Sequence, residues 1–248
     1  GATLIIGDPM EKIFQGVQSW ISNNFGWFLI LVVNIYLFFT VYFAFSKYGK
    51  IRLGGRQAVP EFSRGAWFSM LFSAGMGIGI LFWSVAEPIF HFSSPPQGNP
   101  DTVVAAEEAM KKTFLHWGLH AWAIYALVGL ALAFFSFNRD MPLAFRSIFY
   151  PLLGEKVYKW PGDVIDVLAV LATLFGLATS LGFGAKQVSA GFKHLFNSPD
   201  TVSTQVWLII AITGAATISV VSGLDKGVKK LSELNINLGA ILLVFVLI

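Results

Sequence analysis

Three glycines at alternate positions, Gly75, Gly77 and Gly79, interrupt an apolar run over residues 66–92. A glycine inside a helix costs about 1 kcal/mol relative to alanine, so three of them weaken a spanning helix by about 3 kcal/mol. Within a bilayer, irregular backbone is stable only where it is buried in protein or lines a cavity. The run therefore predicts a helix that is broken near mid-membrane, a geometry that many secondary transporters use to bind substrate and coupling ion.

The same spacing has a second interpretation. Gly75 and Gly79 form a GxxxG pair, and small residues at this spacing let two membrane helices pack closely. The additional Gly77 and the nearby Ser73 favour a discontinuity, whose exposed carbonyls are good ligands for a hard cation such as Na⁺.

The composition indicates an integral membrane protein of the all-α class. Hydrophobic residues make up 55% of the 248 residues and charged residues only 12%, whereas soluble domains carry about 25% charged residues. Six runs have the length of about 20 residues that a membrane helix needs. They are residues 25–45, 65–92, 114–137, 164–185, 205–222 and 234–248. A soluble protein would need six such helices with almost no polar faces, which disfavours a soluble fold.

Basic residues alternate between the connecting segments. Lysine and arginine gather in residues 47–64, 139–159 and 226–230, whereas residues 93–101 and 197–204 contain neither. Cytoplasmic loops of membrane proteins are enriched in these residues. The alternation places the three basic segments inside and the other two outside, in a multi-pass protein of the cell (inner) membrane.

This topology predicts three parts. Residues 1–24 form an outer N-terminal segment, residues 25–64 a peripheral span with a cytoplasmic loop, and residues 65–248 a five-helix repeat. The chain begins without Met and ends inside an apolar run, so we expect a span before Gly1 and a truncated last helix. Residues 102–112 and 140–154 are predicted to form short surface helices.

Aromatic side chains are dense in residues 114–125. At about 100° per residue, Trp117, Tyr125 and Trp122 fall at about 0°, about 80° and about 140° on one helix. Such an arc can wall an aromatic box, which holds a quaternary ammonium group through cation–π attraction of about 2 kcal/mol or more when desolvated. The alternative is an interfacial belt of aromatic side chains at the outer end of a span.

Polar residues within the spans have competing roles. Glu87, which precedes Pro88, is interpreted as a helix end near the outer interface. His116 and His120 have a metal-compatible spacing, but no carboxylate lies nearby in sequence, which favours hydrogen bonding between helices. A hydroxyl such as that of Thr173 can bind an ion or bond back to its own helix.

Composition also excludes several classes of protein. The chain has no cysteine, which rules out a disulfide framework or a thiolate-based metal or redox site. The net charge of +3 is explained by basic cytoplasmic loops and is no signal for nucleic acid. The spans contain no nucleophile–base pair that would indicate an enzyme, and they contain no filter motif that would indicate a channel.

Seven short motifs in order resemble the betaine/carnitine/choline transporter (BCCT) family. They are 50–54 (KIRLG), 73–79 (SAGMGIG), 82–83 (FW), 87–88 (EP), 116–125 (HWGLHAWAIY), 172–176 (ATLFG) and 180–182 (SLG). The resemblance implies the LeuT-type inverted-repeat fold, with twelve spans in the whole family member. By this match the chain holds the first repeat and one preceding span, six transmembrane helices in all.

The resemblance also implies a substrate site for a trimethylammonium compound. Three aromatic residues would form the box, and the glycine backbone would lie against the substrate. These residues are Trp117, Trp122 and Tyr125 for the box and Gly75, Met76, Gly77 and Gly79 for the backbone.

Sodium sites are implied in the same way. The carbonyls of Ser73 and Met76 match one Na⁺ site, and the hydroxyl of Thr173 matches a second. The partner hydroxyl expected four residues after Thr173 is replaced by Leu177, and Thr179 does not lie on that face. The second site is therefore incomplete.

The coupling ion follows from the glycine run. Proton-coupled choline members of the family commonly carry Asp within it, whereas this chain has Gly79, which leaves a proton without a carrier. The resemblance thus predicts Na⁺-coupled symport of glycine betaine or a related compatible solute. The alternatives are a proton-coupled choline carrier, a sodium-independent carnitine exchanger and, outside the class, a membrane enzyme or channel. The expected partners are this small-molecule substrate, membrane lipids and, from the family, two further copies in a homotrimer.

Overall fold

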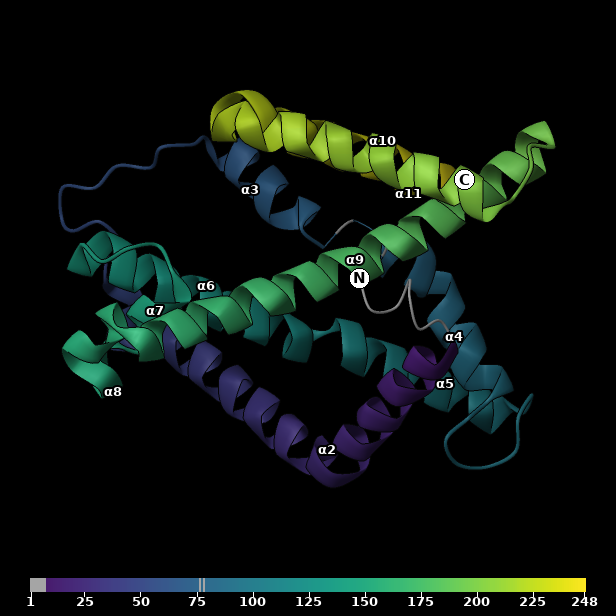
Figure 1. The fold of residues 1–248 in the computed structure, drawn as a ribbon, viewed down its shortest axis with the longest axis horizontal. Helices are drawn as coiled ribbons and strands as arrows, with labels where there is room; N and C mark the ends of the chain where they lie inside the picture. Colours follow the sequence, from purple (N-terminus) through teal and green to yellow (C-terminus); the bar gives the residue numbers. More distant parts are fainter. Residues whose placement is uncertain (1–7, 76, 78) are drawn as a thin grey trace. The chain divides into compact units, whose positions relative to one another are not determined.

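The computed structural model describes residues 8–75, 77 and 79–248, and every regular element in this part of the chain is helical (Figure 1). In chain order the elements are α2 (Asp8–Phe45), η1 (Lys47–Lys50), α3 (Arg64–Ser73), η2 (Gly79–Trp83), α4 (Ser84–Ser93), α5 (Val103–Trp117), α6 (Leu119–Arg139), α7 (Phe145–Ile148), α8 (Tyr150–Leu153), η3 (Gly154–Tyr158), α9 (Trp160–Phe196), α10 (Val202–Val221), η4 (Leu224–Val228) and α11 (Lys229–Leu247). These helices confirm the all-α class.

Five helical stretches in the described residues are long and apolar enough to cross a membrane. They are Lys12–Phe45, Val103–Arg139, Trp160–Phe196, Val202–Val221 and Leu224–Leu247. Large apolar side chains are exposed along them, as expected where lipid replaces water as the solvent. The remaining predicted span, residues 65–92, is divided into α3, η2 and α4.

The chain divides into two compact units. The first unit contains Gly1–Arg56 and Phe114–Leu143, and the second contains Gln57–Thr113 and Ala144–Ile248. In the first unit, α2 packs along α6, and the Thr40 hydroxyl, bonded to the Tyr36 carbonyl at 2.8 Å, also lies 3.5 Å from the Ala123 carbonyl of α6.

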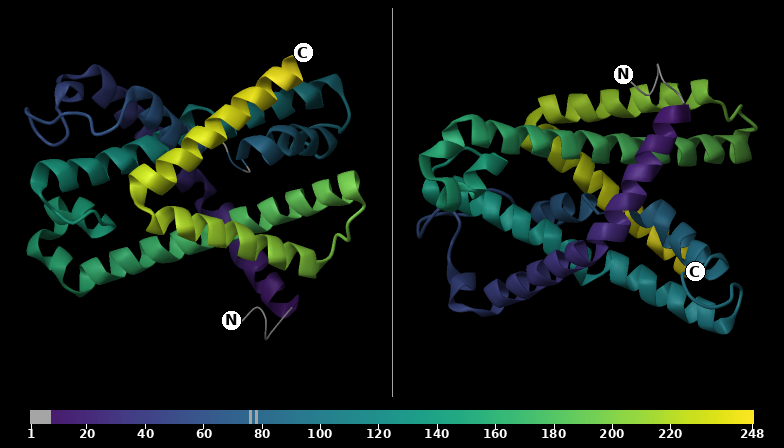
Figure 2. Two further views of the ribbon diagram at one scale, coloured as in Figure 1. Left: turned by 90° about the horizontal axis from the view of Figure 1, so that it is seen from above. Right: turned by 60° about the horizontal axis from the view of Figure 1, so that its bottom comes forward.

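In the second unit, α9 and α10 lie side by side (Figure 2). The loop between them is fixed by Asp200, which accepts hydrogen bonds from the Ser189 hydroxyl at 2.6 Å and the Gln205 amide at 3.2 Å. These bonds, the Ser189 bond most of all, lower the pKa of Asp200 because they stabilise its charged form. α11 packs along α3.

The segment predicted as a surface helix, residues 140–154, folds as α7 and α8 and continues into η3. Arg146 of α7 donates to Asp166 at 2.5 Å, to Asp163 at 2.8 Å and to the Val157 carbonyl at 3.3 Å. The two carboxylates raise the pKa of Arg146. This arginine ties the segment to the start of α9.

Two predicted helix ends are wrong. α2 begins at Asp8 rather than near residue 25, because an apolar run marks only the membrane-crossing part of a helix and helical structure continues beyond it. Glu87 and Pro88 do not end a helix: α4 starts at Ser84 and runs through both to Ser93. Pro88 is the fifth residue of α4 and lies inside the helix, where it removes one backbone hydrogen bond.

Candidate functional site

The glycine run breaks the helix, as the sequence predicts. α3 ends at Ser73, and the Gly75 amide donates to the Phe72 carbonyl at 3.0 Å in a closing turn. The next helical segment, η2, is a π-helical turn that begins at Gly79. Such wide turns are rare and often occur at functional sites. The predicted ligand Met76 lies outside the described residues.

Gly77 lies in open space within this break. A Cβ atom built on Gly77 meets no other atom within 4 Å. Close helix packing through small residues requires a neighbouring backbone at that distance. Among the described residues, Gly77 therefore makes no such packing contact.

The two sides of the break are attached to other helices of the second unit. The Ser73 hydroxyl donates to the Ser232 carbonyl of α11 at 3.1 Å. On the other side, the Phe183 ring of α9 stacks on Phe82 at 5.8 Å between centroids and meets Trp83 edge-on at 5.5 Å. Sequence reasoning missed Phe183, because no local pattern reveals a partner 100 residues away. The break is therefore flanked by a contact to α11 on one side and to α9 on the other.

Thr173, the predicted ligand of the second sodium site, lies on α9. Its hydroxyl donates to the Ala169 carbonyl at 2.9 Å, and the Thr179 hydroxyl donates to the Phe175 carbonyl at the same distance. Both bonds follow the local pattern that competes with ion binding. Each oxygen keeps its lone pairs, since it is the donor, so the bond leaves a cation ligand in place.

The aromatic segment is not one helix, which corrects the predicted arc. α5 ends at Trp117, Gly118 is extended with φ −85° and ψ −150°, and α6 begins at Leu119. A Cβ atom on Gly118 would collide with the Phe114 carbonyl oxygen. Only glycine fits this bend, so the angles expected for a continuous helix do not apply.

The bend nevertheless brings the three predicted box residues together. The Trp122 indole N–H donates to the Trp117 carbonyl at 3.2 Å, and the Trp122 and Tyr125 rings meet edge-on at 6.0 Å between centroids. The His116 ring lies 4.8 Å from that of Trp117. Trp122 is 41% and Tyr125 49% exposed, so both rings have free surface for a cation.

The predicted site residues fall into two groups. Trp117, Trp122 and Tyr125 lie in the first unit, whereas Ser73, the glycine run and Thr173 lie in the second. Trp122 contacts both other aromatic residues of the first group, whereas Ser73 bonds to α11 and Thr173 bonds within α9. The union of these residues in one site stays a prediction. Among the described residues, no three His, Asp or Glu side chains gather to hold a metal.

Comparison with known proteins identifies the class. The family model for the BCCT, betaine/carnitine/choline family transporter, matches residues 1–248. The chain is 48% identical to the glycine betaine transporter of Acinetobacter baylyi over 98% of its length, which is 37% of that protein. It is 44% identical to the glycine betaine transporter OpuD of Bacillus subtilis, with 99% of the chain and 48% of the relative covered.

A choline carrier is similar to the same extent. The high-affinity choline transport protein of Escherichia coli (strain K12) is 44% identical, with 99% of the chain and 36% of the relative covered. The chain thus spans less than half the length of each of these three relatives. Because the family model covers all 248 residues, the chain belongs to the betaine/carnitine/choline family of membrane transporters.

Proposed function

We propose that this chain forms the first-repeat half of a Na⁺-coupled symporter for glycine betaine or a related quaternary ammonium compatible solute. In this proposal the fold is of the LeuT type, with α3 and α4 together making a sixth span. The protein works by alternating access, in which the broken helix moves relative to its neighbours around a site near mid-membrane.

The observation that carries the proposal is the open helix break at Gly77. Its backbone is accessible to a ligand, and α3 ends beside it at Ser73. The final carbonyls of a helix have no partner within that helix and are suited to a hard cation. The paired rings of Trp122 and Tyr125 supply the complementary surface for an ammonium group.

The choice of Na⁺ over H⁺ rests on Gly79. This position has no titratable side chain, whereas proton-coupled choline members of the family commonly carry Asp in the run. A proton-coupled choline carrier is the second candidate, because the choline transport protein of Escherichia coli is 44% identical to the chain.

Uptake by the complete transporter in proteoliposomes separates the two. We expect an inward Na⁺ gradient to drive accumulation of labelled glycine betaine, and a pH gradient at equal Na⁺ to drive none. Labelled choline at the same concentration is the substrate control. Equal accumulation with the pH gradient alone would rule out sodium coupling, and accumulation of choline but not betaine would favour the second candidate.

A further inference from the structure

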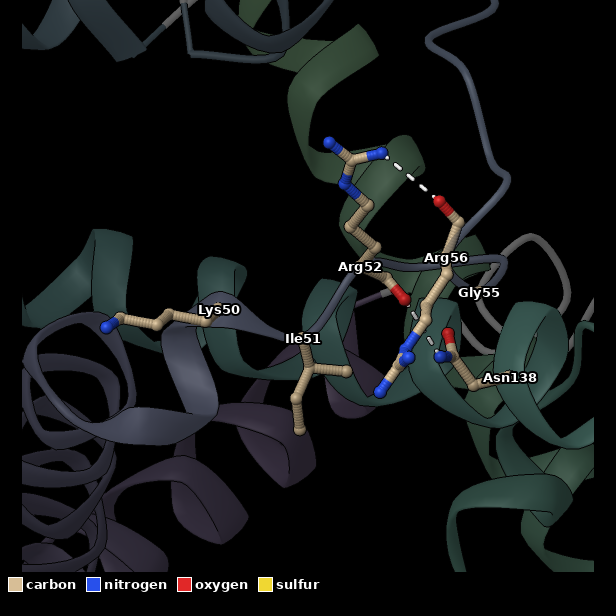
Figure 3. A pocket seen from close by; sticks show the side chains of 6 residues that line it. All are labelled: Lys50, Ile51, Arg52, Gly55, Arg56 and Asn138. Carbon is tan, nitrogen blue, oxygen red and sulfur yellow. Dashed lines mark hydrogen bonds between the residues drawn. The ribbon is translucent and has the colours of Figure 1, made fainter.

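A polar pocket lies where the chain leaves the end of α2. It has a volume of about 520 Å³ and is lined by Lys50, Ile51, Arg52, Gly55, Arg56 and Asn138, all of the first unit (Figure 3). Three of these side chains are cationic, and none of the described lining residues is acidic. Such a pocket favours an anion.

The loop that carries these cations is held in one conformation. The Asn138 amide donates to the Arg52 carbonyl at 2.9 Å and accepts from the Gly54 amide at 3.0 Å. Gly54 and Gly55 both have positive φ, 80° and 88°, which other residues rarely adopt. The charges are therefore attached to a fixed backbone at the end of α6.

An apolar groove of about 610 Å³ adjoins the pocket and shares Ile51 with it. It runs between α2 and α6, with Thr40 and Phe43 on one wall and Leu130 and Phe134 on the other. The α2 wall belongs to the span Lys12–Phe45, and the polar pocket follows directly after that span. Groove and pocket thus meet at the level where acyl chains give way to headgroups.

The three cations do not point the same way (Figure 3). The Arg56 guanidinium lies on the side of Ile51 and Asn138, whereas Arg52 points to the opposite side and donates to the Arg56 carbonyl at 3.2 Å. Lys50 extends away from both. Arg56 is therefore the cation on the side of Ile51, the lining residue that the pocket shares with the apolar groove.

We propose that this pair of cavities binds one anionic phospholipid. The headgroup phosphate pairs with Arg56 in the polar pocket, and an acyl chain lies in the groove between α2 and α6. Two features distinguish this occupant from a soluble anion or an acidic peptide: the groove is lined almost wholly by apolar side chains, and it begins within a membrane span. None of the residues proposed to bind substrate or sodium lines either cavity.

Lipid binding to the purified transporter in detergent tests the proposal. The probe is dioctanoyl phosphatidylglycerol, measured by native mass spectrometry against phosphatidylcholine with the same chains and against glycerol 3-phosphate. We expect Arg56→Gln to weaken phosphatidylglycerol binding about fivefold or more, because a basic side chain at an anionic lipid surface is worth about that factor. Ala131→Phe, which fills the groove, should weaken it similarly.

Two matched variants are the controls. Lys47→Gln removes an equal charge from η1, and Ala133→Phe adds an equal ring to α6, but neither residue lines the cavities. An equal loss in Lys47→Gln would show diffuse attraction and overturn the proposal. Three other results would also overturn the proposal. They are phosphatidylcholine binding as tightly as phosphatidylglycerol, tight binding of glycerol 3-phosphate without acyl chains, and phosphatidylglycerol binding that is unchanged in Ala131→Phe. Thermal denaturation shows whether Arg56→Gln is folded. If it is not, the difference in phosphatidylglycerol binding between Ala131→Phe and Ala133→Phe tests the proposal.

Discussion

Trp122→Leu is expected to weaken glycine betaine binding about 30-fold, whereas Trp27→Leu leaves it unchanged. A desolvated cation–π contact is worth about 2 kcal/mol, which corresponds to about that factor in affinity. Trp122 contacts two other members of the proposed box, Trp117 through its indole N–H and Tyr125 through its ring. Trp27 lies on α2, is 67% exposed and packs edge-on against its neighbour Phe28.

Isothermal titration of the complete transporter with glycine betaine measures this difference. Trp122→Phe is an informative third variant, because it keeps an aromatic face but loses the N–H that bonds to the Trp117 carbonyl and part of the ring area. Its affinity should fall less than that of Trp122→Leu. Equal losses for Trp122→Leu and Trp27→Leu would show that Trp122 belongs to an interfacial belt and contacts no substrate.

Gly77→Val is expected to reduce betaine uptake about tenfold or more without lowering thermal stability. A Cβ atom at Gly77 meets nothing within 4 Å, so the folded chain has room for the side chain. A substrate that lies against this backbone does not, and forcing extra carbons into an occupied site costs about 1–3 kcal/mol.

Gly129→Val is the matched control, since Gly129 of α6 also has nothing within 4 Å of a built Cβ atom. Initial rates of labelled uptake and thermal midpoints should be measured for both variants. Uptake that falls equally in the two would mean that the Gly77 effect is not specific to the substrate. A lower thermal midpoint for Gly77→Val alone would restore the packing interpretation.

The sequence predicted one helix break and missed another of the same kind. Glycines at alternate positions in an apolar run identified the gap after Ser73, because helix propensity and the demands of the bilayer act locally. Gly118 carries the same local cost, yet it stands alone between strongly helical neighbours. Its bend depends on the close approach of the Phe114 carbonyl, which periodicity does not reveal.

Partners that are distant in sequence were beyond prediction. Asp163 fits the general preference for acid at a helix N-terminus, but its pairing with Arg146 depends on how residues 140–158 fold back onto α9. The bonds of Asn138 to the loop that carries Arg52 likewise join residues 84 and 86 positions apart. From the sequence, Arg52 and Arg56 indicated only the membrane topology. The polar pocket that they line with Asn138 became visible only in the tertiary fold.

The proposed function implies that bound glycine betaine touches both the glycine break and the aromatic cluster, and thiol labelling of Gly77→Cys tests this claim most directly. The chain has no cysteine of its own, so this substitution adds a single reactive group to it. We expect glycine betaine to slow modification of Gly77→Cys, and Trp122→Leu in the same chain to abolish this protection, while Gly129→Cys shows no protection at all. Modification of Gly77→Cys at the same rate with and without glycine betaine would contradict the claim, as would protection that persists in the double variant.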